Sequence, residues 1–551
     1  MSTRERMSSV DTAWLRMDRP NNLMMIVGVM VFGGRVDYQR LLKTLRARLL
    51  PYPRFHQRVA FDATGAWWED DEDFELEGHV MRTALPGSGG KPELQKLVAE
   101  LVSQPLNRHK PLWQFQLVDN YLGGSAMVAR IHHCIADGIA LIGVMNSLTD
   151  TVADAPVEPP AGSLPPKAKR KQHAKPGESH LWDPLLAPLE SALATTKKWS
   201  GTLVSKSVDV WNHPEQAVDY ARISAAVATD IGEIALMPND SNTRFKGKPG
   251  TVKRVAWSDP MSLDEIKAVG KALGCSVNDV LLSCVAGALG DYLAAQGDKV
   301  DGVELRAMVP VNLRAPGGEH QLGNQFGLVP LLLPAGIDHP ITRVFEVRRR
   351  MEKLKGSYQA ALAMGLLSIL GVCPKSIQSQ ILGLIARKAS AVMTNVPGPQ
   401  TQLWLAGERL IEQMFWVPQS GDIGIGVSIL SYNGQVQMGV ITDKRFVPDP
   451  ERIVASFEPE FEHLLLLLLM EPWDGERSTE QIEAILSGNA PAKKEPPVPA
   501  KPSAAPVKRK PKGSTSTLTR KAAGSRSEDS PAVAVSETAA APSRRIPKRF
   551  R

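Results

Sequence analysis

Apolar residues in the first part of the chain follow a pattern that predicts strands mixed with helices. A continuous apolar run over Met24–Phe32 is typical of a buried strand, and leucines at helical spacing predict a helix over Tyr38–Leu50. A second amphipathic helix is expected over Pro92–Gln104. The next two strands, Trp113–Val118 and Ser125–His132, flank a turn with two glycines and so predict a hairpin. This part of the chain therefore predicts a mixed α/β unit.

The same alternation returns after residue 250 and predicts a second α/β unit. Ser262–Glu265 is a capping-box pattern that opens a helix. Ser276 opens another helix, with Asn278 and Asp279 in its first turn. The remaining predicted elements are the strands Val252–Trp257, Leu305–Val311, Leu328–Leu333, Ala391–Thr394, Ile423–Leu430 and Gln435–Ile441, and the helices Ile341–Leu354, Ala360–Arg387 and Asp449–Met470. The last two strands flank Asn433-Gly434, which is a strong hairpin signal.

Composition and charge set two further segments apart. Of the 551 residues, 43% are hydrophobic and 22% charged, which is ordinary for a globular protein. Residues 491–551 carry 15 of the 65 Lys and Arg but 4 of the 58 Asp and Glu, so the rest, with 50 basic and 54 acidic residues, is slightly acidic. Such a tail has too few large apolar groups to offset its ordering entropy. We expect disorder there, and the prolines and lysines after residue 155 predict a linker.

Targeting and redox signals are sparse. The four cysteines show no paired framework, which suits a reducing cytoplasm. We expect no signal peptide, because the charged start has no apolar stretch directly behind it. We also expect no membrane-spanning helix, because the apolar run Ala360–Cys373 is shorter than the roughly 20 residues that a span needs.

Candidate chemistry is concentrated in the seven residues His132–Gly138, which read HHCIADG and follow a predicted strand. Imidazole is the side chain best suited to moving protons near neutral pH. If the strand alternation continues, His133 lies on the apolar face with Ile131, and His132 points to the other side. The alternatives are a structural histidine pair or a metal site. The metal site is disfavoured, because only Cys134 and Asp137 lie near and no second cluster has zinc spacing.

The motif set resembles a known family. His132-His133 followed by Asp137-Gly138 resembles the HHxxxDG motif of the CoA-dependent acyltransferase superfamily. The accompanying segments are Pro111–Trp113, Asn278-Asp279, Pro310–Arg314, Gly323–Gln325 and Asn395–Pro399, with Ser9–Asp11 near the start. Together they resemble the bacterial wax ester synthase/acyl-CoA:diacylglycerol acyltransferase family over roughly residues 7–472. Asn21–Ile26 departs from the expected Met-His-Val segment, which bears on substrate choice more than on chemistry. Walker, GxGxxG and GxSxG motifs are absent, which argues against nucleotide-dependent enzymes and serine hydrolases.

The resemblance implies an α/β fold of two chloramphenicol-acetyltransferase-like lobes, with mixed sheets flanked by helices and the active site between them. The expected segments are an N-terminal lobe (1–155), a Pro/Lys-rich linker (156–180), a helical connection (181–245), a C-terminal lobe (246–475) and a disordered basic tail (476–551).

The resemblance also implies the reaction. A long-chain fatty acyl group would pass from acyl-CoA, a co-substrate, to diacylglycerol or a long-chain alcohol, without a cofactor or metal. His133 is the expected general base. Asp137 is expected to hold the motif loop, through Arg314, and His132 either orients the site or is a packed neighbour. The first candidate donor to the oxyanion is Asn278; Thr394 and Asn395 are the next.

Three alternatives stay open. Another hydroxyl acceptor is compatible with the same motifs, because acceptor choice depends on pocket shape. A non-catalytic protein that coats lipid inclusions is the second, and nucleic-acid binding, which rests on the basic tail alone, is the third. Such an enzyme is expected in the cytoplasm, in peripheral contact with the inner membrane or with lipid inclusions.

Overall fold

The computed structural model describes residues 4–63, 65–158, 237–312, 322–355, 378, 380, 381, 383, 386–419, 421–470 and 478–486. Contacts divide the chain into Met1–Pro491 and Ala492–Arg551, and every described residue belongs to the first unit. The predicted start of the disordered tail at residue 476 is wrong, because Thr479–Leu486 is a helix whose Ile482 and Leu486 pack into the core of the second half. The tail beyond residue 486, most of the linker and helical connection, and most of the predicted helix 360–387 lie outside the described residues.

The first sheet combines strands from both halves of the chain. In order across the sheet they are β13 (Trp404–Leu405), β14 (Glu408–Trp416), β2 (Met25–Phe32), β7 (Gly124–His132), β6 (Trp113–Tyr121) and β5 (Val80–Ala84). Neighbours are antiparallel except β5 and β6. The predicted hairpin between β6 and β7 turns through Leu122 and Gly123, whose φ values of 49° and 84° suit a two-residue turn.

Helices cover both faces of this sheet. They are α1 (Ser9–Met17), α2 (Tyr38–Arg48), α3 (Lys91–Val102) and α4 (Gly138–Leu148). Helices α1, α2 and α4 share one core with the face of the sheet that carries Ile131, whereas α3 packs with the opposite face, which carries Val128. The residues of β7 are therefore divided between two apolar cores, and the last strand residues point in opposite directions.

The second sheet runs in the order β11 (Phe326–Leu333), β10 (Leu305–Asn312), β12 (Ala391–Pro397), β15 (Ile425–Tyr432), β16 (Gln435–Asp443) and β8 (Lys253–Trp257), with β9 (Met261–Ser262) also paired to β16. Strand β12 is parallel to both neighbours. The predicted hairpin at Asn433-Gly434 is confirmed, since both residues have positive φ and join β15 to β16.

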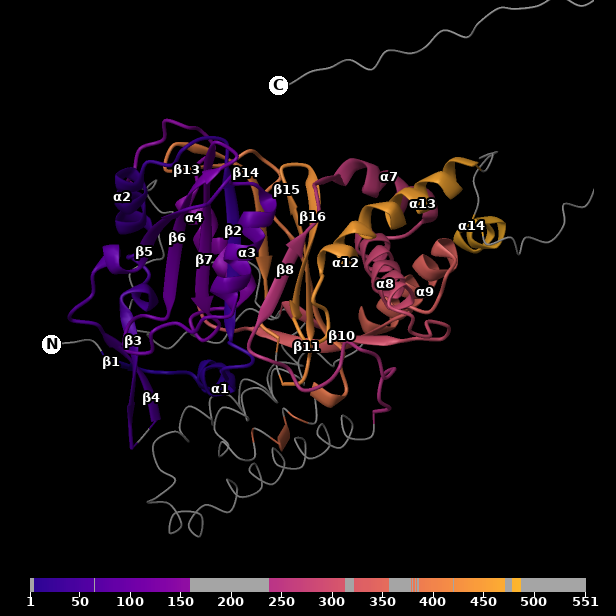
Figure 1. Cartoon of the computed structure of the whole chain (residues 1–551), viewed down its shortest axis with the longest axis horizontal. Helices are drawn as coiled ribbons and strands as arrows, with labels where there is room; N and C mark the ends of the chain where they lie inside the picture. Colours follow the sequence, from indigo (N-terminus) through magenta and orange to yellow (C-terminus); the bar gives the residue numbers. More distant parts are fainter. Residues whose placement is uncertain are drawn as a thin grey trace, which may run out of the picture. The chain divides into compact units, whose positions relative to one another are not determined.

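Helices of the second half pack on one face of this sheet. They are α7 (Leu263–Leu273), α8 (Val277–Ala295), α9 (Pro340–Lys355), α12 (Glu451–Ala455), α13 (Phe457–Met470) and α14 (Thr479–Leu486). Helices α8 and α9 contact β11, and α13 packs against α8 and α9 (Figure 1). The single last helix expected from the sequence is wrong: it divides at Ser456, because Pro459 has no N–H and fits only in the first turn of a helix.

A crossover connects the two lobes. Strands β13 and β14, which the sequence placed within the C-terminal lobe, belong to the first sheet: β14 pairs with β2, and β13 pairs with β14. Trp416 at the end of β14 meets Trp257 of β8 edge to face, with ring centroids 5.6 Å apart. An apolar core that includes Met414 and Leu430 fills the space between the sheets. The two lobes therefore share one interior along this contact.

A small sheet completes the described fold. It consists, in order across the sheet, of β1 (Arg4–Arg6), β4 (Gly65–Asp70) and β3 (Gln57–Asp62). The short helix η1 (Pro53–Phe55) comes directly before β3, and η2 (Leu76–Gly78) follows β4. Among the described residues, α8 alone is long and apolar enough to cross a membrane, and 78% of that stretch is buried inside the lobe, as in a core helix of a globular protein.

Candidate active site

His133 lies just beyond the end of β7, held by backbone and aromatic contacts. Its N–H donates to the carbonyl oxygen of Met24, 2.8 Å away, which continues the pairing of β7 with β2. Its imidazole stacks on Trp14 of α1, with centroids 4.0 Å apart and planes 12° apart, and Phe326 of β11 lies 5.6 Å away. The side chain thus points to the face predicted from the strand alternation, and His133 is 4% exposed.

An asparagine from the other lobe binds the ring. Nδ1 of His133 lies 2.8 Å from Oδ1 of Asn324. The Nδ2 group of Asn324 donates to Oδ1 of Asp11, at 2.8 Å, and to the carbonyl oxygen of His133, at 2.9 Å. Since an amide oxygen can only accept, Nδ1 of His133 must carry the proton in this arrangement. Nε2 is then left with a lone pair, as a base requires.

The protonation states suit a base. Burial lowers the pKa of His133 to about 4, and the charge of nearby Asp137 opposes this shift only in part. Burial also raises the pKa of Asp11 to about 6, against the hydrogen bonds from Asn324 and Ser8. His133 is therefore neutral at pH 7 and able to accept a proton.

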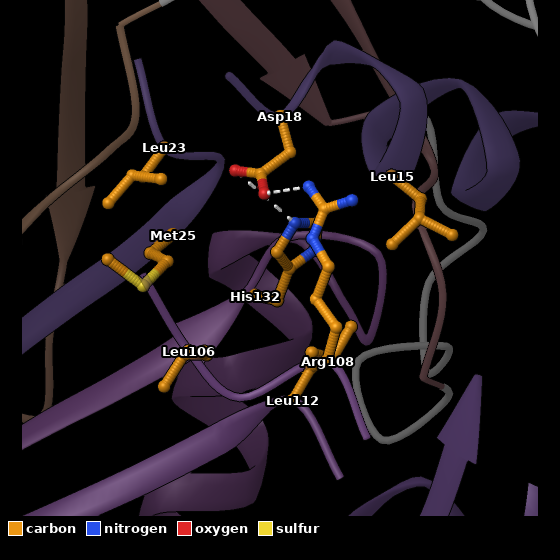
Figure 2. Close-up of a pocket in the computed structure, with 8 residues that line it drawn as sticks. All are labelled: Leu15, Asp18, Leu23, Met25, Leu106, Arg108, Leu112 and His132. Atoms are coloured by element: carbon orange, nitrogen blue, oxygen red, sulfur yellow. Dashed lines mark hydrogen bonds and ion pairs between the residues drawn. The ribbon is translucent and has the colours of Figure 1, made fainter. Parts of the chain in front are cut away.

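His132 lies on the opposite face of the strand, as predicted. Figure 2 shows its ring below Asp18, whose carboxylate also binds Arg108, at 2.7 Å. The N–H of Cys134 donates to Nδ1 of His132, at 3.1 Å, so this ring carries its proton on Nε2, 3.8 Å from Asp18. The pocket beside it has a volume of about 10 Å³, room for about one water molecule, so it holds no substrate. The geometry makes His132 a packed residue that stabilises the turn.

Asp137 fastens the motif loop at two points. Its Oδ1 accepts from the N–H of Ala140 and caps α4, at 3.0 Å, and its Oδ2 accepts from the N–H of Gln325, at 2.9 Å. Ala136 forms a parallel β-bridge with Gly323 next to these bonds. Residues 323–325 of the second lobe therefore bind the motif loop, and we call this pair of contacts, Asp137 with Gln325 and Ala136 with Gly323, the clasp. The expected partner of Asp137, residue 314, lies outside the described residues.

Replacing Asp137 with asparagine should destabilise this clasp. Asparagine has one acceptor oxygen for two N–H groups, the buried one of Ala140 and the partly buried one of Gln325, so either orientation of its amide leaves one N–H facing another donor. We expect a loss of about 1–3 kcal/mol in unfolding free energy and a lower kcat, measured by urea unfolding and ester formation. Asp37→Asn is the matched control: Asp37 caps α2 through a single bond to Arg40. An Asp137→Asn protein as stable as Asp37→Asn would contradict the clasp.

The candidate oxyanion donors lie on two other elements. Asn278, in the first turn of α8, is exposed and its Oδ1 accepts from Nδ2 of Asn395 on β12, at 2.6 Å. Asp279 has the structural role of a capping residue, since its carboxylate accepts from the N–H of Ser276, at 2.8 Å. Thr394 is buried and its hydroxyl has no hydrogen-bond partner in the described part of the chain. Among the described residues, none of these side chains forms a hydrogen bond with His133, so their role stays a prediction.

Two alternative chemistries find no support in the site. Cys134 is fully buried, which raises the pKa of its thiol well above the usual value, so it is a poor nucleophile at neutral pH. Within the described residues, no group of three or more His, Cys, Asp or Glu side chains could hold a metal ion.

A largely apolar pocket lies on the His133 side of the strand. Ala129 and Ile131, which share the strand face with His133, line it together with Leu141 and Met145 of α4. Gly398-Pro399, from the segment that the sequence singled out after β12, closes it from the second lobe. Its volume is about 80 Å³.

Sequence reasoning missed the residues that hold the imidazole. It named Gly323–Gln325 as one of the family-like segments, whereas Asn324 binds the ring itself. It noted Asp11 only as part of a family-like opening, and it did not single out Trp14. The spacing of three between Asp11 and Trp14 was the available signal, because it places both side chains on one face of α1.

Comparisons with known proteins agree with this site. Two family models match, the wax ester synthase/diacylglycerol acyltransferase catalytic domain over residues 7–281 and the WS/DGAT C-terminal domain over residues 322–465. The probable diacylglycerol O-acyltransferase tgs1 of Mycobacterium tuberculosis (strain ATCC 25618 / H37Rv) is 25% identical over 472 residues, which cover 84% of this chain and 96% of that protein. The probable diacylglycerol O-acyltransferase tgs2 of the same strain is 27% identical over 403 residues, 72% of this chain and 83% of that protein.

Among solved structures, the wax ester synthase/diacylglycerol acyltransferase from Marinobacter aquaeolei VT8 matches with a TM-score of 0.60 at 20% identity, covering 84% of this chain and 100% of that chain. This match confirms the expected two-lobed α/β fold. The fold and the histidine motif define a two-lobed acyltransferase. With both family models matched in order along it, the chain belongs to the wax ester synthase/diacylglycerol acyltransferase family.

Proposed function

We propose that His133 is the general base in the transfer of a fatty acyl group from acyl-CoA to a hydroxyl of diacylglycerol or of a long-chain alcohol. Nε2 of His133 takes the hydroxyl proton as the oxygen attacks the thioester carbonyl. The new C–O bond forms, the C–S bond breaks, and the proton goes to the departing CoA thiolate. No acyl-enzyme intermediate is needed, and the reaction requires acyl-CoA as its co-substrate but no cofactor.

The observation that carries this proposal is the state of the buried imidazole. Family membership makes the chain an O-acyltransferase, and this activity needs a base for the acceptor hydroxyl. His133 is neutral at pH 7, has its Nδ1 occupied by Asn324, and lies on the strand face that lines the apolar pocket. General-base help of this kind is typically worth about 10²- to 10⁴-fold in rate.

The lining of the pocket suits an apolar substrate group. Its lining from α4 and β14 is mostly apolar, with Asn146 and Gln413 as its polar side chains. An acyl chain gains about 0.8 kcal/mol for each methylene group that it buries, so such a lining favours fatty substrates. We assign the developing oxyanion to Asn278 first and to Thr394 or Asn395 next; losing one such donor commonly costs about 10²- to 10³-fold.

A two-acceptor assay tests the function. Purified full-length protein is incubated with palmitoyl-CoA and either hexadecanol or dioleoylglycerol, and wax ester, triacylglycerol and free CoA are measured. We expect at least one ester, formed in equal amount with free CoA. Hydrolysis of palmitoyl-CoA without any ester, or no CoA release, would contradict the proposal. A product with only another hydroxyl acceptor would retain the chemistry and change the acceptor.

Contact with a lipid surface follows from the proposed substrates, because diacylglycerol and long-chain alcohols partition into lipid. The last turn of α13 exposes Leu466, Leu469 and Met470 by 58%, 70% and 78%. Replacing these three residues with serine should weaken binding to vesicles that contain dioleoylglycerol, measured by co-sedimentation. Phe61→Ser is the matched control, since Phe61 is exposed by 67% on the small sheet. Equal binding by the triple variant and the wild type would remove this turn from the proposal.

A further inference from the structure

We propose that Asp11 and Asn324 are positioning residues that hold His133 in the tautomer protonated on Nδ1, which leaves Nε2 free to act as the base. This inference rests on the proposed function of His133 as the general base. Neither Asp11 nor Asn324 contacts the reacting atoms in this scheme; both act through the imidazole.

The orientation of the Asn324 amide is determined by its surroundings. Nδ2 of Asn324 lies between two hydrogen-bond acceptors, the carboxylate of Asp11 and the carbonyl oxygen of His133. Both protons of the amide are therefore used, and Oδ1 faces Nδ1 of His133. A flipped amide would lose both bonds and place its oxygen against two acceptors. Leaving a buried polar group unsatisfied costs about 1–3 kcal/mol, so the flipped state is disfavoured.

The amide orientation in turn selects the tautomer. With Oδ1 as the neighbour of Nδ1, only an imidazole with its proton on Nδ1 makes the 2.8 Å hydrogen bond. The alternative tautomer would place two lone pairs in contact and would carry its proton on the nitrogen that must accept one. The two hydrogen bonds that link Asp11, Asn324 and His133 therefore allow a carboxylate on α1 to determine which nitrogen of the His133 ring carries the proton.

The local structure holds these three hydrogen-bonded side chains rigidly. Asp11 lies in the first turn of α1, where its N–H is capped by Ser8, at 3.0 Å. Trp14, one turn later on the same helix, stacks on the imidazole and fixes the plane of the ring. Asp11, Asn324 and His133 are all buried, so water does not compete for these bonds. Asn324 comes from the second lobe, so the base is complete only when both lobes are in place.

Other histidines of this chain show that the arrangement is specific. His132 carries its proton on Nε2, because Nδ1 accepts from Cys134. His79 is also buried and stacked on a tryptophan, but its Nδ1 lies 2.8 Å from a plain backbone carbonyl, that of Trp113. Only for His133, among the described histidines, does an amide backed by a carboxylate bind Nδ1. A carboxylate behind the amide makes Oδ1 a stronger acceptor and the imidazole a stronger base.

The charge of Asp11 should make kcat depend on pH. Burial raises the pKa of Asp11 to about 6; hydrogen bonds from Asn324 and Ser8 and the charge of Arg54 favour its ionised form, and the charge of Asp137 opposes it. The thiol of Cys134 also lies close enough to feel this carboxylate, but burial keeps it neutral. As pH rises through about 6, Asp11 ionises, so His133 becomes a better base and kcat should rise in a partial step. Asp11→Asn should abolish that step.

The test compares kinetic variants of the full-length protein with palmitoyl-CoA and the acceptor that the wild type uses. Loss of the correct tautomer lowers kcat by about 10⁴-fold in serine proteases, so we expect about a 10²- to 10⁴-fold loss for Asn324→Ala. KM for palmitoyl-CoA should change by no more than about threefold. Asp11→Leu removes the acceptor and should approach the Asn324→Ala loss, whereas Asp11→Asn keeps an acceptor oxygen and most of kcat. The Asp11→Leu/Asn324→Ala double variant should lose no more than Asn324→Ala alone.

A direct measurement of the tautomer is independent of turnover. In protein labelled with ¹⁵N-histidine, the resonances that disappear in His133→Ala identify this ring. They should show a proton on Nδ1 in the wild type and in Asp11→Asn, and a mixture of tautomers in Asp11→Leu. If Asn324→Ala does not fold, the two Asp11 variants carry the comparison, because Asp11 does not touch the imidazole.

The outcomes separate this inference from the proposed function. If the wild type forms ester and His133→Ala does not, but Asp11→Leu and Asn324→Ala keep the wild-type kcat and tautomer, the inference is overturned and the function stands. Losses that multiply in the double variant would show independent structural damage and would also overturn it. If His133→Ala forms ester like the wild type, the proposed function fails and the inference fails with it.

Discussion

Replacing His133 with alanine should lower kcat for ester formation by about 10²- to 10⁴-fold, the usual worth of a general base. The attacking hydroxyl then has no group to take its proton, while the pocket of Ala129, Ile131 and α4 stays in place. KM for palmitoyl-CoA should therefore change little. The measurement is steady-state ester formation with the better of hexadecanol and dioleoylglycerol.

His79 provides the matched control for His133. Both rings are buried, both stack on a tryptophan, and both have Nδ1 within 2.8 Å of an oxygen. His79→Ala should reduce stability in the same way but leave kcat close to that of the wild type. A His79→Ala protein as inactive as His133→Ala would show that lost packing, and not a lost base, explains the effect.

The pH profile gives a second check on His133. Burial lowers its pKa to about 4, and only the neutral form accepts a proton. As pH falls through about 4, the ring is protonated in the free enzyme and kcat/KM should fall about tenfold per pH unit. Above about pH 5 His133 itself imposes no loss, apart from the partial step assigned to Asp11. A steep loss centred near the ordinary histidine pKa of about 6.5 would contradict a buried base.

Local signals in the sequence were sufficient for most of the fold. Capping serines before α7 and α8, the Asn433-Gly434 turn and the alternation of β7 each act over a few residues, and each was confirmed. The crossing of β14 into the first sheet was not predicted. Strand β14 alternates like any strand, and its choice of β2 as a partner depends on contacts between segments almost 400 residues apart, which no short pattern records.

The candidate site divides in the same way. Alternation alone separated His133 from His132, because side-chain direction in a strand has a period of two. Alternation could not identify the partners of His133, because Asn324 lies 191 residues away and Asp11 lies on helix α1 at the start of the chain. Both are ordinary polar residues whose role depends on the atoms that face them. A resemblance pointed to their segments, but only the hydrogen bonds show what they do.

A buried ion pair should prove the most sensitive point of the lobe interface. Lys253 on β8 and Asp443 on β16 face each other in register, and Nζ lies 2.8 Å from Oδ2 with side chains 6% and 0% exposed. Nζ also lies 3.1 Å from Oδ1 of Asn22, whose Nδ2 donates to the carbonyl oxygen of Gly421. Asn22 belongs to Asn21–Ile26, the segment that departs from the family pattern. Because Asn22 connects Lys253 to the backbone of Gly421, this departure has a structural role in addition to any effect on substrate choice.

Lys253→Met should therefore cost about 3–5 kcal/mol of unfolding free energy, because it leaves the carboxylate of Asp443 buried without its cation. Urea unfolding of the full-length protein measures the loss, and the exposed pair of Lys267 and Asp264 provides the control, since Lys267→Met should change stability far less. The Lys253→Met/Asp443→Leu double variant removes both charges and should recover much of the loss. Oδ1 of Asp443 also accepts from the N–H of Arg445, at 3.0 Å. If the double variant is less stable than Lys253→Met, this hydrogen bond, and not the charge of Asp443, is the contribution that matters here.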